Sequence, residues 1–257
     1  MRRVLVIGIG AGDPGHVTIQ AVAALNAADV FFVMDKGAAK HDLVRLRREI
    51  CERYIEDTSY RIVEVRDPER DRAAPDYAAA VAAWRSARAD VWEALIAAEL
   101  GADGCGAFLV WGDPALYDST IAVLDEVASR RRVTFEFEVI PGISSFQALA
   151  AAHRVPLNRV GEPIAITTGR RLRESLGDRA GDVVVMLDAG TAFDAVQDGE
   201  TEIYWGAYVG TGHEILVSGR LSDVAADIIR LRAEARERHG WIMDVYLLRR
   251  AVCRGEN

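Results

Sequence analysis

Short apolar runs alternate with stretches of helical periodicity along nearly the whole of this 257-residue chain. Val4–Ile7 is a continuous apolar run that ends in glycine, and Val30–Val33 is a second run of the same kind. Such runs are typical of strands that are buried on both faces. Between them, Thr18 can cap a helix that extends to Ala28. Because strand-like and helix-like segments alternate in this way, the sequence predicts an α/β fold.

The alternation continues on both sides of Pro141-Gly142, where we place the boundary between two lobes. A chain of this length can bury one core in each half. We therefore expect an N-terminal α/β lobe over residues 1–140 and a C-terminal α/β lobe over residues 141–257. Further helices are expected at 42–54, from a cap at Asp76 to a terminal Gly101, at 119–130 and at 221–238. Further strands are expected at 61–66, 107–111, 134–140, 164–168, 183–187, 202–209, 214–217 and 241–248.

The composition argues against several classes of protein. Asp and Glu outnumber Lys and Arg by 39 to 31, and a net charge of -8 repels a phosphate backbone, so we expect no binding to nucleic acid. No apolar run approaches the roughly 18–20 residues of a membrane span. The three cysteines are widely spaced and the five histidines lack metal-ligand spacing, so we expect neither a disulfide framework nor a metal site. These features favour a cytoplasmic protein, with Cys105 in an exposed loop between two glycines.

Three short turns follow expected strands. GIGAGDP (residues 8–14) follows the first strand, WGDPALY (111–117) follows the strand at 107–111, and PGISS (141–145) follows the strand at 134–140. Glycine lets the backbone turn sharply and lets a ligand approach it closely. Since ligands of open α/β sheets collect at the carboxyl ends of strands, we expect the first two turns to converge on one crevice. The third turn places two hydroxyls and free backbone amides at an expected helix start.

A dinucleotide site is one alternative for the first turn, and a tight turn without a ligand is another. The dinucleotide fingerprint is G-x-G-x-x-G running straight into a helix. Here the third glycine comes one residue early and is followed by Asp13-Pro14, whose carboxylate would repel a pyrophosphate. Asp35, near the end of the second strand, agrees with a nicotinamide-dependent oxidoreductase. That hypothesis does not account for the other two turns.

Taken in order, these segments resemble the tetrapyrrole methylase family, the class III methyltransferases that use S-adenosylmethionine. The resemblance spans nearly the whole chain and implies two α/β lobes with the cofactor in the cleft between them. It also implies S-adenosylhomocysteine as a product and a homodimer as the assembly. The matching segments are residues 8–14 with Thr18, ADVFF (28–32), GDP (112–114) with Tyr117 and VIPGISS (139–145), with weaker matches at 186–187 and 217–219.

The resemblance carries the family's cofactor contacts onto eight positions of this sequence. The sequence departs from the commoner family pattern at Ala11, where many members have proline, and at Trp111, where many have a further glycine. Alanine is small enough to be tolerated, whereas Trp111 bears on the shape of one wall of the pocket. The eight positions are Ala11, Gly112, Asp113, Leu116, Ser144, Ser145, Met186 and Gly210.

Segments 34–37, 43–51 and 243–249 resemble members that methylate a cobalt-free corrin precursor and remove a two-carbon acyl fragment. Methyl transfer from a sulfonium depends on alignment, which agrees with the absence of a catalytic triad or a carboxylate pair. Removal of the acyl fragment requires a delivered water and a donor for the developing oxyanion. Asp35, His41 and Tyr117 are candidates for that step, and the catalytic residues stay unassigned. Methylation at another macrocycle position, or of ribosomal RNA or a diphthamide precursor, stays open.

Lys36 and Lys40 are the only lysines of the chain, and both follow the strand expected at 30–33. A corrin precursor carries many carboxylates, and an acidic enzyme needs a local cationic patch to hold them. We therefore expect these two lysines to bind the polycarboxylate substrate. The arginines at 45, 47 and 48 could extend that patch or form a solvated helix face. A second basic cluster, at 170–173, is expected to face solvent.

Overall fold

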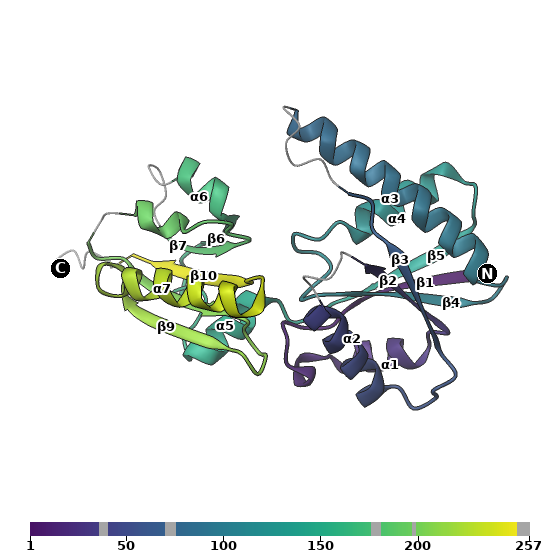
Figure 1. The fold of residues 1–257 in the computed structure, drawn as a ribbon, viewed down its shortest axis with the longest axis horizontal. Helices are drawn as coiled ribbons and strands as arrows, with labels where there is room; N and C mark the ends of the chain where they lie inside the picture. Colours follow the sequence, from purple (N-terminus) through teal and green to yellow (C-terminus); the bar gives the residue numbers. More distant parts are fainter. Residues whose placement is uncertain (36–40, 70–75, 176–180, 197–198, 251–257) are drawn as a thin grey trace. The chain divides into compact units, whose positions relative to one another are not determined.

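The computed structural model describes residues 1–35, 41–69, 76–175, 181–196 and 199–250. Its contacts divide the chain into two compact units, Met1–Ser144 and Ser145–Asn257. Within the described residues each unit contains a five-stranded sheet with helices packed on it, which confirms two α/β lobes (Figure 1). The division falls after residue 144, whereas the sequence pattern placed it after residue 140.

The sheet of the first unit is parallel in every pairing that the described residues make, with the strand order β3-β2-β4-β1-β5. Parallel strands end at the same edge of a sheet, so the segments that follow β1, β4 and β5 lie side by side. The strands are β1 (Arg2–Gly8), β2 (Val30–Asp35), β3 (Arg61–Arg66), β4 (Cys105–Val110) and β5 (Phe135–Ile140).

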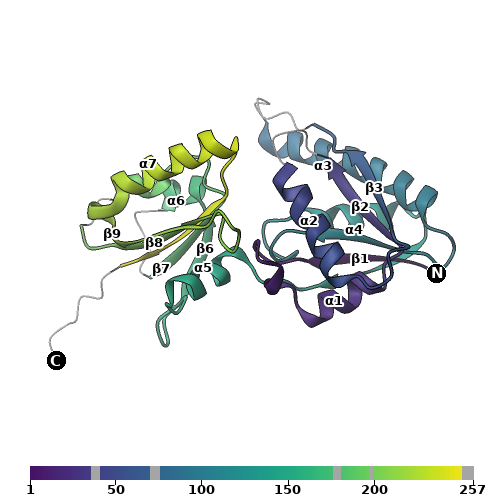
Figure 2. The same cartoon turned by 60° about the horizontal axis from the view of Figure 1, so that its bottom comes forward.

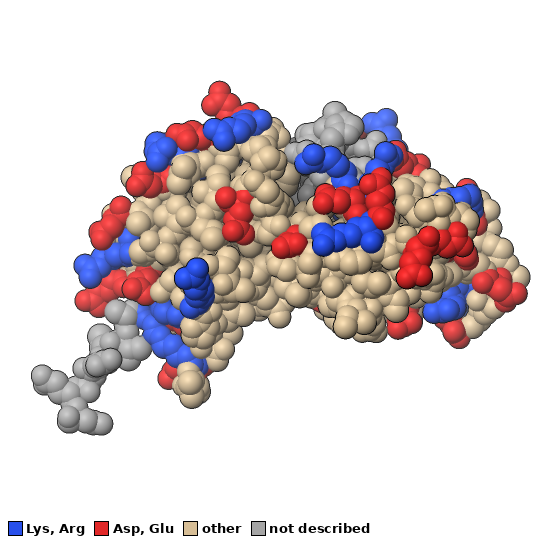
Figure 3. All heavy atoms as spheres, turned by 90° about the horizontal axis from the view of Figure 1, so that it is seen from below, with Lys and Arg blue, Asp and Glu red and all other residues tan. Residues whose placement is uncertain are grey.

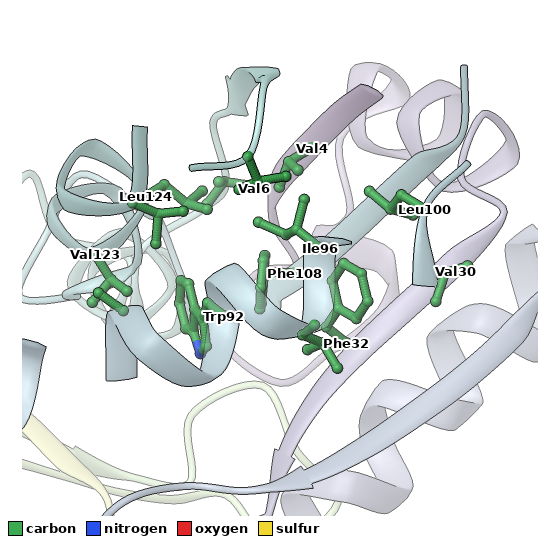
Figure 4. Close-up of a cluster of buried hydrophobic side chains, with 14 of the residues drawn as sticks. Val4, Val6, Val30, Phe32, Trp92, Ile96, Leu100, Phe108, Val123 and Leu124 are labelled. Carbon is green, nitrogen blue, oxygen red and sulfur yellow. The ribbon is translucent and has the colours of Figure 1, made fainter. Parts of the chain in front are cut away.

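Helices cover both faces of this sheet (Figures 1 and 2). The helices α1 (Ile19–Asn26) and α2 (His41–Tyr54) pack on one face, and α3 (Tyr77–Glu99) and α4 (Thr120–Arg130) pack on the other. The α3 side is built around Trp92, which is fully buried and stacks on a phenyl ring of β4 with the ring centroids 4.1 Å apart (Figure 4). Apolar runs without alternation follow from this burial on both faces.

Two helix starts agree with the caps expected from the sequence. The Thr18 hydroxyl accepts the amide of Ala21 at 3.0 Å, and the Asp76 carboxylate accepts the amide of Ala79 at 3.0 Å. The end of α3 differs from the prediction, because Leu100 forms its C-cap in an extended conformation. Gly101 therefore does not end this helix in the left-handed conformation for which glycine is favoured.

The sheet of the second unit is mixed and has the strand order β6-β7-β10-β8-β9. Only β6 and β7 pair in parallel, and the other pairings among the described residues are antiparallel. The helix α7 (Leu221–His239) packs on one face and ends at Gly240 with φ 74°, as its sequence predicts, while α5 (Ser145–His153) packs against β8 and β10. The other elements are β6 (Ile164–Thr168), α6 (Gly169–Ser175), β7 (Asp182–Met186), β8 (Glu202–Ala207), β9 (Ile215–Arg220) and β10 (Asp244–Arg249).

The prediction for Cys105 is wrong. Cys105 is the first residue of β4 and is 5% exposed, and burial raises the pKa of its thiol. The flanking Gly106 also lies in the strand, and a Cβ there would come within 2.5 Å of the Phe32 ring. Glycine at this position reflects close packing and not a loop. Cys51 in α2 is also buried, and this burial raises the pKa of its thiol to about 11.

Charged side chains of both signs are interspersed on the face drawn in Figure 3.

Among the described residues, no helix combines the length and the apolar character that crossing a membrane requires. The same part of the chain holds no group of three or more His, Cys, Asp or Glu side chains that could bind a metal ion.

Candidate functional site

The loops after β1 and β4 are joined backbone to backbone at the carboxyl edge of the first sheet. The Gly112 amide donates to the Gly10 carbonyl at 2.8 Å, and the Gly10 amide donates to the Gly112 carbonyl at 3.3 Å. Both glycines have left-handed backbones, with φ of 80° at Gly10 and 70° at Gly112. Non-glycine residues adopt this conformation only at a cost, so the two turns depend on glycine at these positions.

The loop after β5 packs on the same two turns through further glycines. A Cβ added to Gly142 would lie 2.2 Å from the Gly112 carbonyl oxygen and 2.8 Å from the Gly8 carbonyl carbon. A Cβ added to Gly8 would lie 2.6 Å from the Gly142 nitrogen. The three loops therefore contact one another through their main chains, and side chains at these positions would force them apart.

The Asp113 carboxylate ties the β4 loop to the β5 loop. One of its oxygens accepts the Gly142 amide at 2.9 Å, and the other accepts the Ala115 amide at 2.8 Å. Hydrogen bonds of amides to an ionised acceptor are among the stronger ones in proteins. Asp113 thus holds the shape of the site, and its negative charge lies beside the two glycine turns.

Five of the predicted cofactor contacts lie in these three loops of the first unit. Ala11 is 1% exposed and follows the paired Gly10, and Ser144 is 5% exposed with its Cα 3.8 Å from the Cβ position of Gly112. The Leu116 amide donates to the Asp113 carbonyl at 3.2 Å, which closes the turn that follows Asp113. The structure brings together Ala11, Gly112, Asp113, Leu116 and Ser144.

The remaining three predicted contacts lie in the second unit. Ser145 is the first residue of α5. Met186 ends β7 and pairs with Val245, which in turn pairs with Gly206 near the end of β8. Gly210 follows β8 in a turn with φ 80°, and its amide donates to a Glu214 carboxylate oxygen at 2.8 Å. The ends of β7 and β8 thus lie at one edge of the second sheet, on either side of β10.

A buried carboxylate that the sequence pattern did not reveal fixes the turn after Met186. Asp188 is 7% exposed and accepts the amides of Gly190 at 3.0 Å and Ala192 at 2.7 Å, as well as the Tyr246 hydroxyl at 2.8 Å. Burial, followed by the charge of Asp188, raises the pKa of Tyr246, so this phenol stays a donor. Gly190 and Ala192 are close to Asp188 in sequence, but Tyr246 lies 58 positions away, so no local motif could have signalled this part of the network.

The same network extends to Arg232 of α7. Its guanidinium donates to the Asp188 carbonyl at 2.7 Å and to the Asp244 carboxylate at 2.9 Å, and Asp244 also accepts the Trp205 indole N–H at 3.1 Å. Burial raises the pKa of Asp244 despite these donors. Between Met186 and this network, Leu187 is 63% exposed and has φ 52°. Such strain persists only where the surrounding structure enforces it.

The arginines of α2 differ in their surroundings. The Arg47 guanidinium donates to the Leu109 carbonyl at 3.2 Å, and burial lowers the pKa of Arg47. Arg48 pairs with Glu64 at 3.1 Å, and Arg45 is exposed. A wholly solvated helix face, one of the two alternatives for these arginines, therefore does not describe Arg47.

Several predicted residues can be placed only in part. Lys36 and Lys40 lie outside the described residues. Asp35 ends β2 and His41 begins α2, and the structure describes the side chain of neither. Tyr117 is 46% exposed, with φ 51° in the loop that follows β4.

The first glycine turn does not form the dinucleotide-binding arrangement. Asp13 caps a short 3-10 turn, Pro14–His16, by accepting the Gly15 amide at 2.7 Å. The helix α1 begins only at Ile19. A dinucleotide site needs the glycine loop to run directly into the helix whose N-terminus faces the pyrophosphate. That alternative is therefore rejected for this turn.

The fold and the three joined loops agree with one family of enzymes. The family described as Tetrapyrrole (Corrin/Porphyrin) Methylases matches residues 3–225, and the chain belongs to this family. The expectation drawn from the strand-end motifs is thereby confirmed at the level of the family.

The chain is 53% identical to the precorrin-6A synthase [deacetylating] of Sinorhizobium sp over 252 residues, which is 98% of this chain and 97% of that protein. A crystal structure of a cobalamin synthesis related protein (CobF) from Corynebacterium diphtheriae has a TM-score of 0.83 and 38% identity, covering 97% of this chain and 99% of that one. Uroporphyrin-III C-methyltransferase from Thermus thermophilus, complexed with S-adenosyl homocysteine, shares the fold with a TM-score of 0.59 at 18% identity, covering 96% of each chain.

Proposed function

We propose that the chain is an S-adenosylmethionine-dependent C-methyltransferase that methylates C1 of precorrin-5 with loss of acetate, giving precorrin-6A. The observation that carries this proposal is the 53% identity, over nearly the full length of both chains, to a precorrin-6A synthase. The motifs of residues 34–37, 43–51 and 243–249 support the same choice within the family.

The proposed cofactor contacts are the eight residues that the family resemblance singles out. The site of the first unit fits the adenosyl sulfonium in two respects: the backbone at Gly112 is open to close approach, because only the Ser144 Cα lies within 4 Å of its Cβ position, and Asp113 supplies one negative charge. A carboxylate beside the turns would disfavour the binding of a negatively charged pyrophosphate but not that of a positively charged sulfonium. The contacts are Ala11, Gly112, Asp113, Leu116, Ser144, Ser145, Met186 and Gly210.

S-adenosylmethionine supplies an activated methyl group together with its leaving group. The residues of this chain then have to hold the methyl carbon and the acceptor carbon in line and exclude water. Alignment of this kind can lower a barrier by as much as about 7–11 kcal/mol. In the proposal, the joined glycine loops make the site rigid enough for this alignment. Asp113 holds the loops that follow β4 and β5 together. Loss of acetate also consumes a water molecule, and no residue is assigned to that step.

Calorimetric titration with S-adenosylhomocysteine, with NADH as the control, tests the cofactor. We expect binding of the first and none of the second; binding of NADH alone would overturn the proposal. Incubation with S-adenosylmethionine and precorrin-5 then tests the reaction. The product mass should show one added methyl group and the loss of the two-carbon fragment. Methylation of precorrin-2 and not of precorrin-5 would assign the chain to another reaction of the family.

The substrate carboxylates are proposed to bind Lys36 and Lys40. Replacing both with methionine removes two positive charges and should raise KM for precorrin-5, because charge-assisted hydrogen bonds to carboxylates are lost. The affinity for S-adenosylhomocysteine should stay unchanged. Steady-state kinetics beside calorimetry measures both quantities, and an unaltered KM would show that the substrate carboxylates bind elsewhere.

The enzyme is further proposed to act in the cytoplasm as a homodimer, with no nucleic-acid or membrane partner. The proposal rests on the family resemblance and on the net charge of -8. Light scattering coupled to size-exclusion chromatography tests the assembly, and a monomeric mass at micromolar concentration would contradict it.

A further inference from the structure

Arg88 of α3 is a buried arginine that the proposed reaction does not use directly. Its side chain is 6% exposed and pairs with the Asp67 carboxylate at 2.8 Å, and Asp67 directly follows β3. The guanidinium also lies 4.8 Å from the ring centroids of both Trp84 and Trp92. Arginine packed between aromatic rings and paired with a carboxylate is held in one orientation.

This fixed arginine reaches the loop that carries the candidate site. Its Nη1 donates to the Ser119 hydroxyl at 2.8 Å, and Ser119 is the last residue before α4. Serine at a helix start usually accepts a helix amide, but the Ser119 side chain makes no capping hydrogen bond. Its hydroxyl instead accepts from Arg88.

The β4–α4 loop (residues 111–119) is thus held at both ends. Asp113 fixes its beginning through the amides of Gly142 and Ala115, and Arg88 fixes its end through Ser119. The neighbouring Asp118 accepts the Thr120 amide at 2.7 Å. Burial lowers the pKa of Arg88, and the charges of Asp67 and then Asp118 offset part of this shift.

The strained segment of the loop lies between these two attachments. Tyr117 has φ 51°, which is costly for a bulky side chain and needs support from the surrounding structure. An attachment at Ser119, two positions further along the chain, limits how far this segment can relax.

We propose that Arg88 is a positioning residue for the β4–α4 loop: it anchors the Ser119 end of the loop and thereby sets the affinity of the site for its cofactor. The statement about affinity rests on the proposed function. The anchoring of the loop does not, because it concerns the protein without a ligand.

The variants Ser119→Ala and Ser119→Thr isolate this contact. Ser119→Ala removes the acceptor and leaves the Arg88–Asp67 pair in place, whereas Ser119→Thr keeps the hydroxyl. We expect Ser119→Ala to weaken the binding of S-adenosylhomocysteine about tenfold, since a hydrogen bond to a charged group is lost. KM for S-adenosylmethionine should rise while kcat changes little, and Ser119→Thr should restore the affinity.

Arg130→Met is the matched control. Arg130 joins α4 to α3 through Asp90 at 2.6 Å and also pairs with Glu126 of its own helix at 3.0 Å, but it lies at the opposite end of α4 from Ser119. This variant should lower the stability to urea and leave the affinity for S-adenosylhomocysteine unchanged. If affinity simply followed stability in Ser119→Ala and Arg130→Met, the role of Arg88 would be structural only and the proposal would be wrong.

Amide hydrogen exchange without ligand separates the two levels of the proposal. Peptides that cover residues 111–120 should exchange faster in Ser119→Ala than in the wild type, and not in Ser119→Thr or Arg130→Met. Unchanged exchange in Ser119→Ala would overturn the anchoring. A wild-type protein that does not bind S-adenosylhomocysteine would instead refute the proposed function, while the exchange data would still decide the anchoring.

Discussion

Gly142→Ala should destabilise the first unit by about 3 kcal/mol or more and abolish the binding of S-adenosylhomocysteine. The added Cβ would lie 2.2 Å from the Gly112 carbonyl oxygen and 2.8 Å from the Gly8 carbonyl carbon. These obstacles are main-chain atoms of two other loops, so no side-chain rotation can relieve the overlap. Urea denaturation followed by circular dichroism measures the stability, and calorimetry measures the binding.

Gly101→Ala is the matched control for Gly142→Ala. A Cβ at Gly101 meets no heavy atom within 4 Å, and the residue has no left-handed backbone. Its substitution should change the stability by less than about 0.5 kcal/mol. Equal effects of the two variants would mean that the three loops do not pack as tightly as the structure indicates.

Asp188→Ala should cost about 3–5 kcal/mol of stability in the second unit, since each buried donor left without an acceptor costs about 1–3 kcal/mol. The substitution leaves the amides of Gly190 and Ala192 and the Tyr246 hydroxyl without their common acceptor inside the protein. Tyr246→Phe removes only one of these hydrogen bonds and should cost about 1–2 kcal/mol. Because Asp188 fixes the turn after Met186, a proposed cofactor contact, Asp188→Ala should also weaken the binding of S-adenosylhomocysteine.

Asp194→Ala provides the comparison for Asp188→Ala. Asp194 lies in the 3-10 turn that follows, and its side chain is exposed. Removal of this carboxylate should change the free energy of unfolding by less than about 0.5 kcal/mol. Urea titrations of both variants check the difference, and similar midpoints would show that the Asp188 network contributes little.

The fold was predictable from the sequence where the apolar pattern is unambiguous. The strands expected at 61–66 and 164–168 have those bounds in the structure, and Gly240 ends α7 as expected. The pattern misled at Cys105, because a glycine on each side of a residue is compatible with both a loop and a closely packed strand. It also misled at Gly101, because a helix can end in an extended residue without a left-handed glycine.

The candidate site was predictable only in its local parts. Turns after parallel strands must lie at one edge of the sheet, so the proximity of Gly10 to Gly112 follows from topology. The groups that brace the β4–α4 loop and the turn after Met186 come from distant segments. Arg88 meets Ser119 across 31 positions, and Asp188 meets Tyr246 across 58 positions. No periodicity or motif encodes such pairs, and only the folded chain reveals them.

The position of β5 at the edge of the first sheet affects how two copies of the chain can associate. Strands at a sheet edge invite pairing with a strand of another molecule, and charged residues oppose it. Glu136 and Glu138 alternate along β5 and are exposed. Two β5 strands laid against each other would bring like charges together, which is destabilising. We therefore expect the proposed homodimer to form through another surface, and continuous sheets across molecules are disfavoured at this edge.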